Sequence, residues 1–255
     1  MNDEIEMNDE RKLVIVTGAN GTLGEAYLKR FAKNPDYRTV GLLRRPSDSP
    51  IANVDYIHTD LLDLIGIETE LKKIHPNLYS EIVLIHPVGG FKFESETGLQ
   101  LDKKIFLSNY MTFINIAKSL SRHAPDKKFV FCCFGSVSDK YDIPWWQSYT
   151  HSKNVLRKAM SGLANRNPNI RSVFVNVSTV ETGNESKLRP FADKTYWLQS
   201  DKIVDASIKE IICGTHTFVE MDVFEPAPDF DKNYYSDPKK IRKKWNKEMK
   251  GPQEP

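Results

Sequence analysis

The sequence has few cysteines and no long hydrophobic run. Three cysteines among 255 residues cannot form an even disulfide framework, and Cys132 and Cys133 are adjacent in an apolar segment. Buried thiols in a reducing compartment are therefore expected. No apolar stretch approaches the roughly 20 residues of a membrane-spanning helix. The first ten residues are acidic and lack the basic and apolar regions of a signal peptide. We therefore expect a cytoplasmic protein with no membrane partner.

The sequence also lacks a strong excess of either charge. Its formal net charge of +2 gives no general attraction to nucleic acid or to anionic membranes. The cysteines and the six histidines show no spacing typical of metal ligands, so no metal is expected. A hydrophobic content of 40% with 27% charged residues is ordinary for a globular protein. At this length the chain can form one large α/β domain or two small ones.

Short apolar segments alternate with amphipathic ones along most of the chain. A first strand is predicted at KLVIVT, and further strands at 39–43, 54–59, 82–86, 128–134, 171–177 and 215–223. Helical patterns lie between most of them, including 101–123 and 148–166. Strands that alternate with helices favour a parallel sheet covered on both faces. The pattern predicts an α/β fold with a doubly wound, Rossmann-type parallel sheet in three layers.

No linker rich in proline, glycine or serine divides this alternation, so a single domain is expected over 11–228. The acidic segment 1–10 is expected to be disordered. The segment 229–255 is basic, and its default interpretation is a solvated tail, with a binding patch as the alternative. The positive charge of this tail comes from Lys239, Lys240, Arg242, Lys243, Lys244 and Lys247.

The stretch TGANGTLG (17–24) follows the first strand and opens the first helix. Gly18, Gly21 and Gly24 allow a tight turn, a close approach of a pyrophosphate and close packing of helix on strand. The free N–H groups at the start of the helix can then bind phosphate. A plain glycine-rich turn is the alternative, but the order of strand, turn and helix favours a dinucleotide site.

The end of the second strand indicates which dinucleotide binds. An acidic side chain there would bind the ribose diol, whereas arginine accommodates a 2′-phosphate. The sequence places Arg44 and Arg45 at this point and has no acid before Asp48. Two guanidinium groups favour NADP(H) over NAD(H), although a solvated arginine pair is the alternative. After the third strand, Asp60 and Leu61 can contact the adenine, or Asp60 can cap a helix.

Tyr149 and Lys153 stand four positions apart in SYTHSK, and Tyr235 and Lys239 repeat this spacing in YSDPK. Residues at i and i+4 of a helix share one face. The segment around Tyr149 has good helix formers and no proline, so its two side chains should point the same way. Pro238 disfavours a helix across the second match, which is therefore taken as accidental.

In these features the sequence resembles the short-chain dehydrogenase/reductase family. The glycine turn resembles the nucleotide loop of that family, and Tyr149 and Lys153 resemble its Tyr-x-x-x-Lys motif. The catalytic serine of the family corresponds to Ser136, which precedes Tyr149 by 13 residues; Ser138 is the less well-spaced alternative. The catalytic asparagine corresponds to Asn109, 40 residues before the tyrosine.

The resemblance implies a role for each of these residues. Tyr149 would be the general acid or base, and Lys153 would lower its pKa and hold the nicotinamide ribose. Ser136 would polarise the substrate oxygen, and Asn109 would position a water that relays protons toward Lys153. The resemblance and the loop positions together give these cofactor-binding residues: Gly18, Asn20, Gly21, Thr22, Leu23, Gly24, Arg44, Arg45, Asp60, Leu61, His86, Pro87, Val88, Tyr149, Lys153, Val180 and Thr182.

Two loops depart from the family pattern. His86-Pro87-Val88-Gly89 replaces Asn-Asn-Ala-Gly and keeps only the glycine. After the sixth strand, Val177-Ser178 stands where Pro-Gly is usual. The glycine spacing is commoner in extended members of the family, whereas the chain length is that of the compact members.

Aromatic residues cluster where the family places its substrate pocket. The segments 139–148 and 184–200 supply the expected pocket residues Tyr141, Trp145, Trp146, Phe191 and Trp197. Large aromatic side chains suit a bulky, largely apolar substrate, although several of them can simply close the core, and Lys187 and Arg189 can instead meet an acidic group.

The expected function is an NADP(H)-dependent oxidoreductase acting on a carbonyl or alcohol. The alternatives are an extended-type epimerase or dehydratase acting on a nucleotide sugar, and a non-catalytic NADP(H)-binding regulator. The helices 101–123 and 148–166 pair across the two-fold axis in many family members, so a homodimer or homotetramer is expected. Their apolar residues that can serve both core and interface are Ile105, Phe106, Phe113, Ile114, Val155 and Leu156.

Overall fold

The computed structural model describes residues 11–94, 100–225 and 234–251. Seven strands form one parallel sheet in the order β3-β2-β1-β4-β5-β6-β7. The strands are β1 (Lys12–Thr17), β2 (Tyr37–Leu43), β3 (Val54–His58), β4 (Glu81–His86), β5 (Lys128–Ser136), β6 (Ile170–Val177) and β7 (Phe218–Val223). All seven predicted strands are therefore present.

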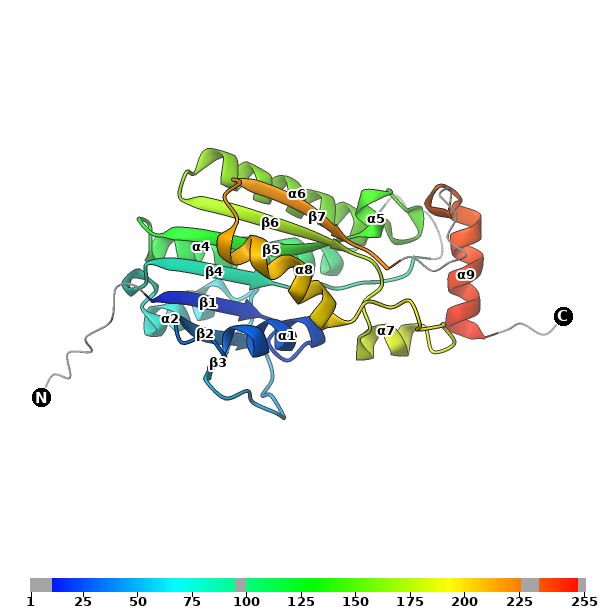
Figure 1. The fold of residues 1–255 in the computed structure, drawn as a ribbon. Coiled ribbons are helices and arrows are strands. Elements are labelled where there is room, and N and C mark those ends of the chain that lie inside the picture. The colour runs from blue at the N-terminus through cyan, green and yellow to red at the C-terminus, as the bar shows by residue number, and fades with distance from the viewer. Residues whose placement is uncertain (1–10, 95–99, 226–233, 252–255) are drawn as a thin grey trace, which may run out of the picture.

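Helices cover both faces of the sheet (Figure 1). One face carries α2 (Leu64–Ile74), α4 (Thr112–His123) and α6 (Gln147–Arg166), and the other carries α1 (Thr22–Phe31) and α8 (Ser200–Cys213). Each face has its own hydrophobic core. The predicted three-layer, doubly wound fold is confirmed.

The alternation of side chains along β1 explains why both faces must be covered. Leu13 and Ile15 pack with the core under α2, α4 and α6, while Val14 and Val16 pack under α1 and α8. All four are fully buried. Because successive residues of a strand point to opposite faces, a continuous apolar run requires a layer of helices on each side.

Short elements gather beyond the carboxyl ends of the strands, and Figure 1 shows α5, α7 and α9 on that side of the sheet. The remaining elements are η1 (Pro76–Leu78), α3 (Lys103–Phe106), the π-helical turn η2 (Leu107–Met111), α5 (Val137–Lys140), η3 (Pro144–Trp146), α7 (Gly183–Leu188), η4 (Tyr234–Ser236) and α9 (Pro238–Lys250).

The expectation of a solvated basic tail is wrong for α9. Ile241 is 1% exposed and Glu248 8%, and Trp245 packs against Trp146. The reason is that apolar residues recur every three to four positions among the lysines of α9, which makes the helix amphipathic. The predicted disordered segment 1–10 lies outside the described residues, as do 229–233 and 252–255.

Two of the three cysteines, Cys132 and Cys133, are buried in β5 as expected, whereas Cys213 at the end of α8 is exposed. No helix in the described parts of the chain is both long and apolar enough to cross a membrane.

Candidate active site

The glycine turn after β1 has the close geometry that a bound pyrophosphate requires. Gly18 has φ +59°, and a Cβ there would lie 3.0 Å from Val88. A Cβ at Gly24 would overlap the carbonyl oxygen of Gly18. Gly21 caps α1 without any side-chain hydrogen bond, so the first N–H groups of the helix have no capping side chain. Small residues and an open helix start therefore fit a phosphate here.

The remaining residues predicted for this turn differ in exposure. Asn20 and Thr22 are exposed, while Leu23 is half-buried against the core under α1. The turn is tied to the second strand, because the N–H of Ala19 donates to the carbonyl oxygen of Leu42 at 3.1 Å.

Arg44 and Arg45 directly follow β2 and are exposed. The link between the turn and β2 brings them to the same edge of the sheet as the glycine turn. Asp60 is also exposed and accepts a hydrogen bond from the N–H of Leu62 at 2.9 Å, and Leu61 is buried. The helix cap that was the alternative role of Asp60 belongs to Asp63, which accepts from the N–H of Gly66.

His86 at the end of β4 faces the core. It is 1% exposed, and its Nδ1 and Nε2 lie 2.8 Å from Thr17 Oγ1 and 3.1 Å from Thr112 Oγ1. Thr112 donates its hydroxyl proton to the Ser108 carbonyl oxygen, so it accepts from Nε2–H. Burial, followed by the charge of Lys153, lowers the pKa of His86 to about 3. Both imidazole nitrogens of His86 are thus engaged within the protein, and its predicted contact with the cofactor stays a prediction. Pro87 and Val88 are half-buried.

Tyr149 and Lys153 share one face of α6, and the Lys153 ammonium lies 5.3 Å from the centre of the Tyr149 ring. The phenol hydrogen-bonds with the side chain of Ser136 at the end of β5. Phe91 packs edge-on against Tyr149 at 5.2 Å. The predicted Ser/Tyr/Lys group is therefore brought together, and Ser136 rather than Ser138 faces the tyrosine.

Tyr235 and Lys239, which repeat the spacing of Tyr149 and Lys153, do not lie on one helix. Tyr235 lies in η4, before Pro238 begins α9, and it stacks on Tyr141 with the ring centres 4.5 Å apart. Lys239 follows on the exposed side of α9.

Asn109 lies in the π-helical turn and is fully buried. Its amide nitrogen donates to the carbonyl oxygens of Gly90 and Ile105 at 2.7 and 2.8 Å. Its Oδ1 has no hydrogen-bond partner within the described residues and lies with Lys153 Nζ against Gly89. An unsatisfied buried acceptor beside an ammonium is a place where a water can bridge the two groups.

The pKa of Lys153 is lowered from its ordinary value, whereas the pKa of Tyr149 is raised. Burial lowers the pKa of Lys153 to about 8, against the opposing effect of Asp139. Burial, and then the charge of Asp139, raises the pKa of Tyr149 above 10.0, while the hydrogen bond with Ser136 lowers it. The expectation that the pKa of Tyr149 is lowered is therefore wrong in this structure, because burial and Asp139 outweigh the stabilising contacts.

Sequence reasoning missed an ion pair next to Ser136, the predicted catalytic serine. Asp139 is 5% exposed, accepts from the N–H of Ser136 at 2.6 Å and pairs with Arg157. Arg157 also pairs with Glu220 at 3.0 Å and lies over the ring of Phe174. Two signals were available: the Ser-x-x-Asp capping pattern from residue 136, and an arginine four residues after Lys153 on the same helix face.

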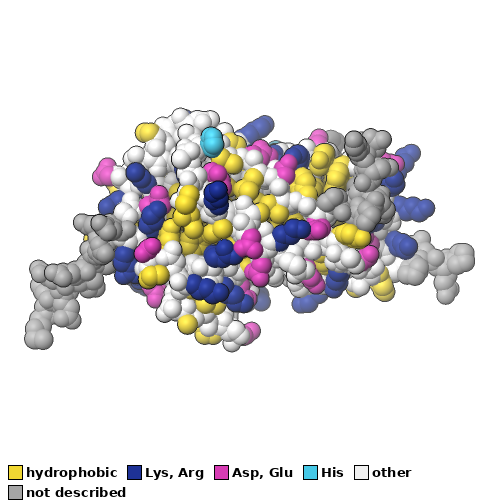
Figure 2. All heavy atoms as spheres, in the orientation of Figure 1, with side chains coloured by type: hydrophobic (Ala, Val, Ile, Leu, Met, Phe, Trp, Pro, Cys, Tyr) yellow, Lys and Arg dark blue, Asp and Glu magenta, His cyan; other side chains and the backbone are white. Residues whose placement is uncertain are grey.

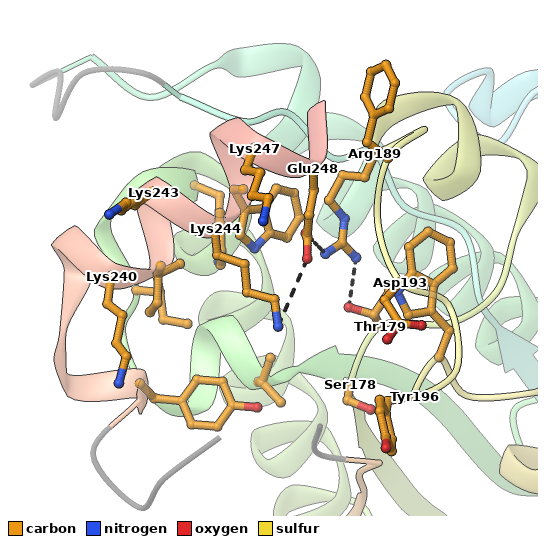
Figure 3. A pocket seen from close by; sticks show the side chains of 18 of the residues that line it. Ser178, Thr179, Arg189, Asp193, Tyr196, Lys240, Lys243, Lys244, Lys247 and Glu248 are labelled. Carbon is orange, nitrogen blue, oxygen red and sulfur yellow. Dashed lines mark hydrogen bonds and ion pairs between the residues drawn. The ribbon is translucent and has the colours of Figure 1, made fainter. Parts of the chain in front are cut away.

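A cavity of about 580 Å³ lies between α9, the loop after α7 and the ends of β5 and β6 (Figure 3). The predicted pocket residues Trp146, Phe191 and Trp197 line it, together with Val137, the neighbour of Ser136. Tyr141 and Trp145 are not among its lining residues.

Tyr141 and Trp145, the two other predicted pocket residues, contact segments next to the cavity. Tyr141 stacks on Tyr235, and the indole N–H of Trp145 donates to the carbonyl oxygen of Pro238 at 2.5 Å. They therefore hold η4 and the start of α9 in place.

Arg189 is 4% exposed and fully engaged, so it is not available to bind an acidic substrate. It donates to Glu185, Glu248 and Thr179 at 2.7, 2.8 and 2.9 Å. It also lies over the ring of Trp245 at 4.1 Å. Figure 3 shows it joining α9 to the loop after α7. Lys187, the other cation considered for that role, is exposed and absent from the cavity lining.

Two further predicted cofactor residues lie on the loop after β6. Val180 forms an isolated parallel bridge with Leu198, and Thr182 caps α7 by accepting from the N–H of Glu185 at 3.1 Å. Both are half-buried at the carboxyl edge of the sheet. Their contact with a nicotinamide stays a prediction.

The parallel sheet, the glycine turn and the Ser/Tyr/Lys group define a protein of the short-chain dehydrogenase/reductase class, which confirms the resemblance seen in the sequence. The chain belongs to the NAD dependent epimerase/dehydratase family, whose model matches residues 14–186. No curated protein sequence matches it significantly.

Solved structures share the fold at low identity. A 4-hydroxyisoleucine dehydrogenase complexed with NADH has 17% identity and TM-score 0.68, over 87% of this chain and 100% of that chain. A short chain dehydrogenase from Burkholderia cenocepacia J2315 in complex with NADP has 17% identity and TM-score 0.70, over 85% and 90%. An actinorhodin polyketide ketoreductase variant with NADPH has 14% identity and TM-score 0.71, over 88% and 99%.

Proposed function

We propose that the protein is an NADP(H)-dependent oxidoreductase that transfers a hydride between the nicotinamide and a carbonyl or alcohol group. The observation that carries the proposal is the convergence of Tyr149, Ser136 and Lys153 at the carboxyl edge of the sheet, beside a glycine turn that fits a pyrophosphate. The structural neighbours in complex with NADH, NADP or NADPH support a nicotinamide cofactor.

The residues on either side of the substrate oxygen have complementary roles. The hydroxyl of Ser136 accepts from the N–H of Ser138 at 3.3 Å and hydrogen-bonds with the phenol of Tyr149. A carbonyl oxygen bound between the two hydroxyls would replace this bond and receive the Ser136 proton, which would polarise the carbonyl. The raised pKa of Tyr149 keeps the phenol protonated near neutral pH, ready to donate to the developing alkoxide. When bound, the cofactor would supply the hydride.

Lys153 and Asn109 would restore the proton to Tyr149. A pKa of about 8 allows Lys153 to gain and lose a proton close to neutral pH. A water bound to the unsatisfied Oδ1 of Asn109 would link this ammonium to solvent.

Arg44 and Arg45 support NADP(H) as the cofactor, because both are exposed at the end of β2 and can pair with a 2′-phosphate. Calorimetric titration should give tighter binding of NADPH than of NADH. Changing both arginines to Ala should weaken NADPH by at least about tenfold and leave NADH nearly unchanged. Equal affinities in the unchanged protein would contradict this choice of cofactor.

The reaction is tested with a panel of aryl and alkyl ketones and aldehydes, followed by NADPH absorbance. Turnover of bulky, largely apolar carbonyls is expected, because aromatic residues line the cavity. Turnover confined to small polar sugars or hydroxy acids would contradict the proposed substrate class. A protein that binds NADPH but turns over no carbonyl would instead be a cofactor-binding regulator.

The family match favours an epimerase or dehydratase of nucleotide sugars as a second candidate. Such an enzyme would use the same tyrosine and lysine to remove and return a proton, while a bound nicotinamide would take up and return the hydride. The two candidates differ in their products. Incubation with a nucleotide sugar would then give an epimer or a dehydrated sugar with no net consumption of cofactor, whereas the oxidoreductase consumes NADPH in proportion to product.

A homodimer or homotetramer is proposed through the segments 101–123 and 148–166. Phe113 and Leu156 are fully buried in the core and Ile105 is 8% exposed, so these three cannot form an interface. The half-buried Phe106, Ile114 and Val155 stay available. Light scattering at micromolar concentration should show at least a dimer, and a monomer would contradict the proposal.

A further inference from the structure

Tyr149, the proposed proton donor, lies in the first turn of α6. It is the third residue of the helix, and the N-cap residue Trp146 supplies no side-chain hydrogen bond to this turn. The N–H groups of a first turn have no partner within the helix, so the geometry of the turn depends on contacts from other segments. An error of about 1 Å in the placement of a reacting group can cost about a hundredfold in rate. The contacts that hold the ring of Tyr149 are therefore important for the proposed reaction.

Phe91 packs on the ring of Tyr149. The ring centres lie 5.2 Å apart and the ring planes are inclined by 78°, which is the edge-to-face arrangement that aromatic pairs favour. Phe91 is half-buried and is not among the residues that line the cavity. We therefore expect Phe91 to affect the reaction through the ring of Tyr149 rather than through the cavity wall.

The segment that carries Phe91 is tied to the start of α6 by Glu94. The carboxylate of Glu94 accepts from the N–H and from the hydroxyl of Ser148 at 3.1 and 2.5 Å. The N–H of Glu94 donates to the carbonyl oxygen of Trp145 at 2.7 Å. Ser148 directly precedes Tyr149, so Glu94 holds the segment against the turn that carries the proposed proton donor.

Helix α9 packs on Phe91 through Trp245. The ring centre of Trp245 lies 5.6 Å from that of Phe91 and 4.6 Å from that of Trp146. Phe93, two residues after Phe91, stacks on Trp245 with the ring centres 5.6 Å apart and the planes inclined by 9°. All of these side chains belong with Tyr149 to one hydrophobic cluster. Phe91 thus contacts both the proposed proton donor and the last helix.

Arg189 holds Trp245 in this position. Its guanidinium lies over the Trp245 ring at 4.1 Å and pairs with Glu248, one turn later on α9, at 2.8 Å. Most of the basic side chains of α9 are exposed, and Figure 2 shows Lys and Arg side chains on the surface at this end of the molecule. An amphipathic helix in this orientation presents its apolar side, with Trp245, to the aromatic cluster.

We propose that Phe91 is a positioning residue for Tyr149, and that α9 keeps Phe91 in place through Trp245. This inference rests on the proposed oxidoreductase function and adds the contacts that hold its proton donor. Because a phenol acts only within hydrogen-bond reach of the substrate oxygen, the packing of the last helix contributes to the rate of the reaction.

Phe91→Leu and Phe93→Leu form a matched pair of variants. Each removes a ring that packs on Trp146 and Trp245, but within the described residues Phe91 is the one that also pairs with the ring of Tyr149. Phe91→Leu should lower kcat about tenfold, with the KM of the ketone and the Kd of NADPH within about twofold. Phe93→Leu should keep kcat within about twofold. Urea denaturation should give similar midpoints for the two variants, and equal kcat values would overturn the inference.

The order of the Tyr149 ring can be measured without turnover, by fluorine NMR of the full chain labelled with 3-fluorotyrosine. The signal of Tyr149 is identified by its absence from Tyr149→Phe. Phe91→Leu and Trp245→Leu should each broaden this signal, because the ring then moves between orientations, whereas Phe93→Leu should leave it sharp. Adding Trp245→Leu to Phe91→Leu should broaden it no further, since the helix acts through Phe91.

The two measurements separate this inference from the proposed function. A sharp signal in Phe91→Leu, or clear further broadening in the double variant, would overturn the positioning role of Phe91. Turnover by the unchanged protein with equal kcat in Phe91→Leu and Phe93→Leu would overturn it as well and would leave the oxidoreductase function standing. The expected broadening together with no turnover of any ketone by the unchanged protein would support the positioning of the ring and contradict the oxidoreductase function.

Discussion

The proposed cofactor side and the proposed substrate side of this molecule meet at one edge of the sheet but are built in different ways. The cofactor side consists of main chain: a turn with φ +59° at Gly18, a contact at Gly24 that excludes any side chain, and an open helix start. The substrate side consists of large side chains from distant segments, with Phe91, Trp146 and Trp245 in mutual contact.

This difference determines how each side responds to a substitution. A main-chain site tolerates no added atom, whereas a side-chain site can lose one group and keep its shape. Changes on the cofactor side should therefore affect cofactor binding and stability together. Changes of the proposed catalytic side chains should lower activity without lowering cofactor binding or stability.

The largest effect is expected for Tyr149→Phe. Loss of the phenol removes the proton donor, so kcat should fall about a thousandfold. NADPH affinity measured by calorimetry should stay within about twofold, because the ring keeps its packing with Phe91. Tyr235→Phe, at the accidental match, is the control and should retain most of the activity. Undiminished turnover by the Tyr149 variant would contradict the mechanism.

On the cofactor side, Gly24→Ala should weaken NADPH binding by about tenfold or more and lower the free energy of unfolding by about 1–3 kcal/mol, since its Cβ would overlap the carbonyl oxygen of Gly18. Gly183→Ala has no atom within 4 Å of the added carbon and should be neutral. Calorimetry and urea denaturation measure both properties. A Gly24 variant that is stable but binds no cofactor would break the proposed coupling.

Lys153→Met should abolish activity yet stabilise the fold. The folded-state pKa of about 8 lies below the ordinary 10.5, so burying the charged lysine costs about 3 kcal/mol near neutral pH. Between these two pH values the unfolded state binds more protons, so the stability of the unchanged protein rises with pH and the advantage of Met disappears. Urea denaturation at pH 7 and pH 10.5 measures this. The exposed Lys158→Met should gain nothing at either pH.

Asp139→Asn should have the smallest effect, confined to the pH profile. Asparagine can still accept from the N–H of Ser136 but lacks the charge that raises the pKa of Tyr149. Asp139 also raises the pKa of Lys153, so loss of its charge lowers both pKa values, and the fall of kcat/KM for reduction on the alkaline side should move to lower pH. Glu220→Gln, on the other side of Arg157, should leave the profile in place. An unshifted profile for Asp139→Asn would remove the proposed influence of Asp139.

The same comparison explains what could be predicted from the sequence. The strands, the glycine turn and the shared face of Tyr149 and Lys153 depend on local patterns, and the structure contains them. The apolar stripe of α9 is a local signal that one face of the helix is buried, but what covers this face is not: Trp245 contacts Phe91 and Trp146, which lie about 100 or more residues away. The raised pKa of Tyr149 was missed for a similar reason, because it depends on burial and on Asp139 in another element.

The most direct test of the central claim is transfer of deuterium from NADPH labelled at its transferable position. The labelled cofactor is incubated with a mixture of aryl and alkyl ketones, and the alcohols are analysed by mass spectrometry. The account predicts deuterium on the carbinol carbon in the unchanged protein and about a thousandfold less labelled product with Tyr149→Phe. Cofactor binding without any labelled alcohol, or equal labelling by the two proteins, would contradict it.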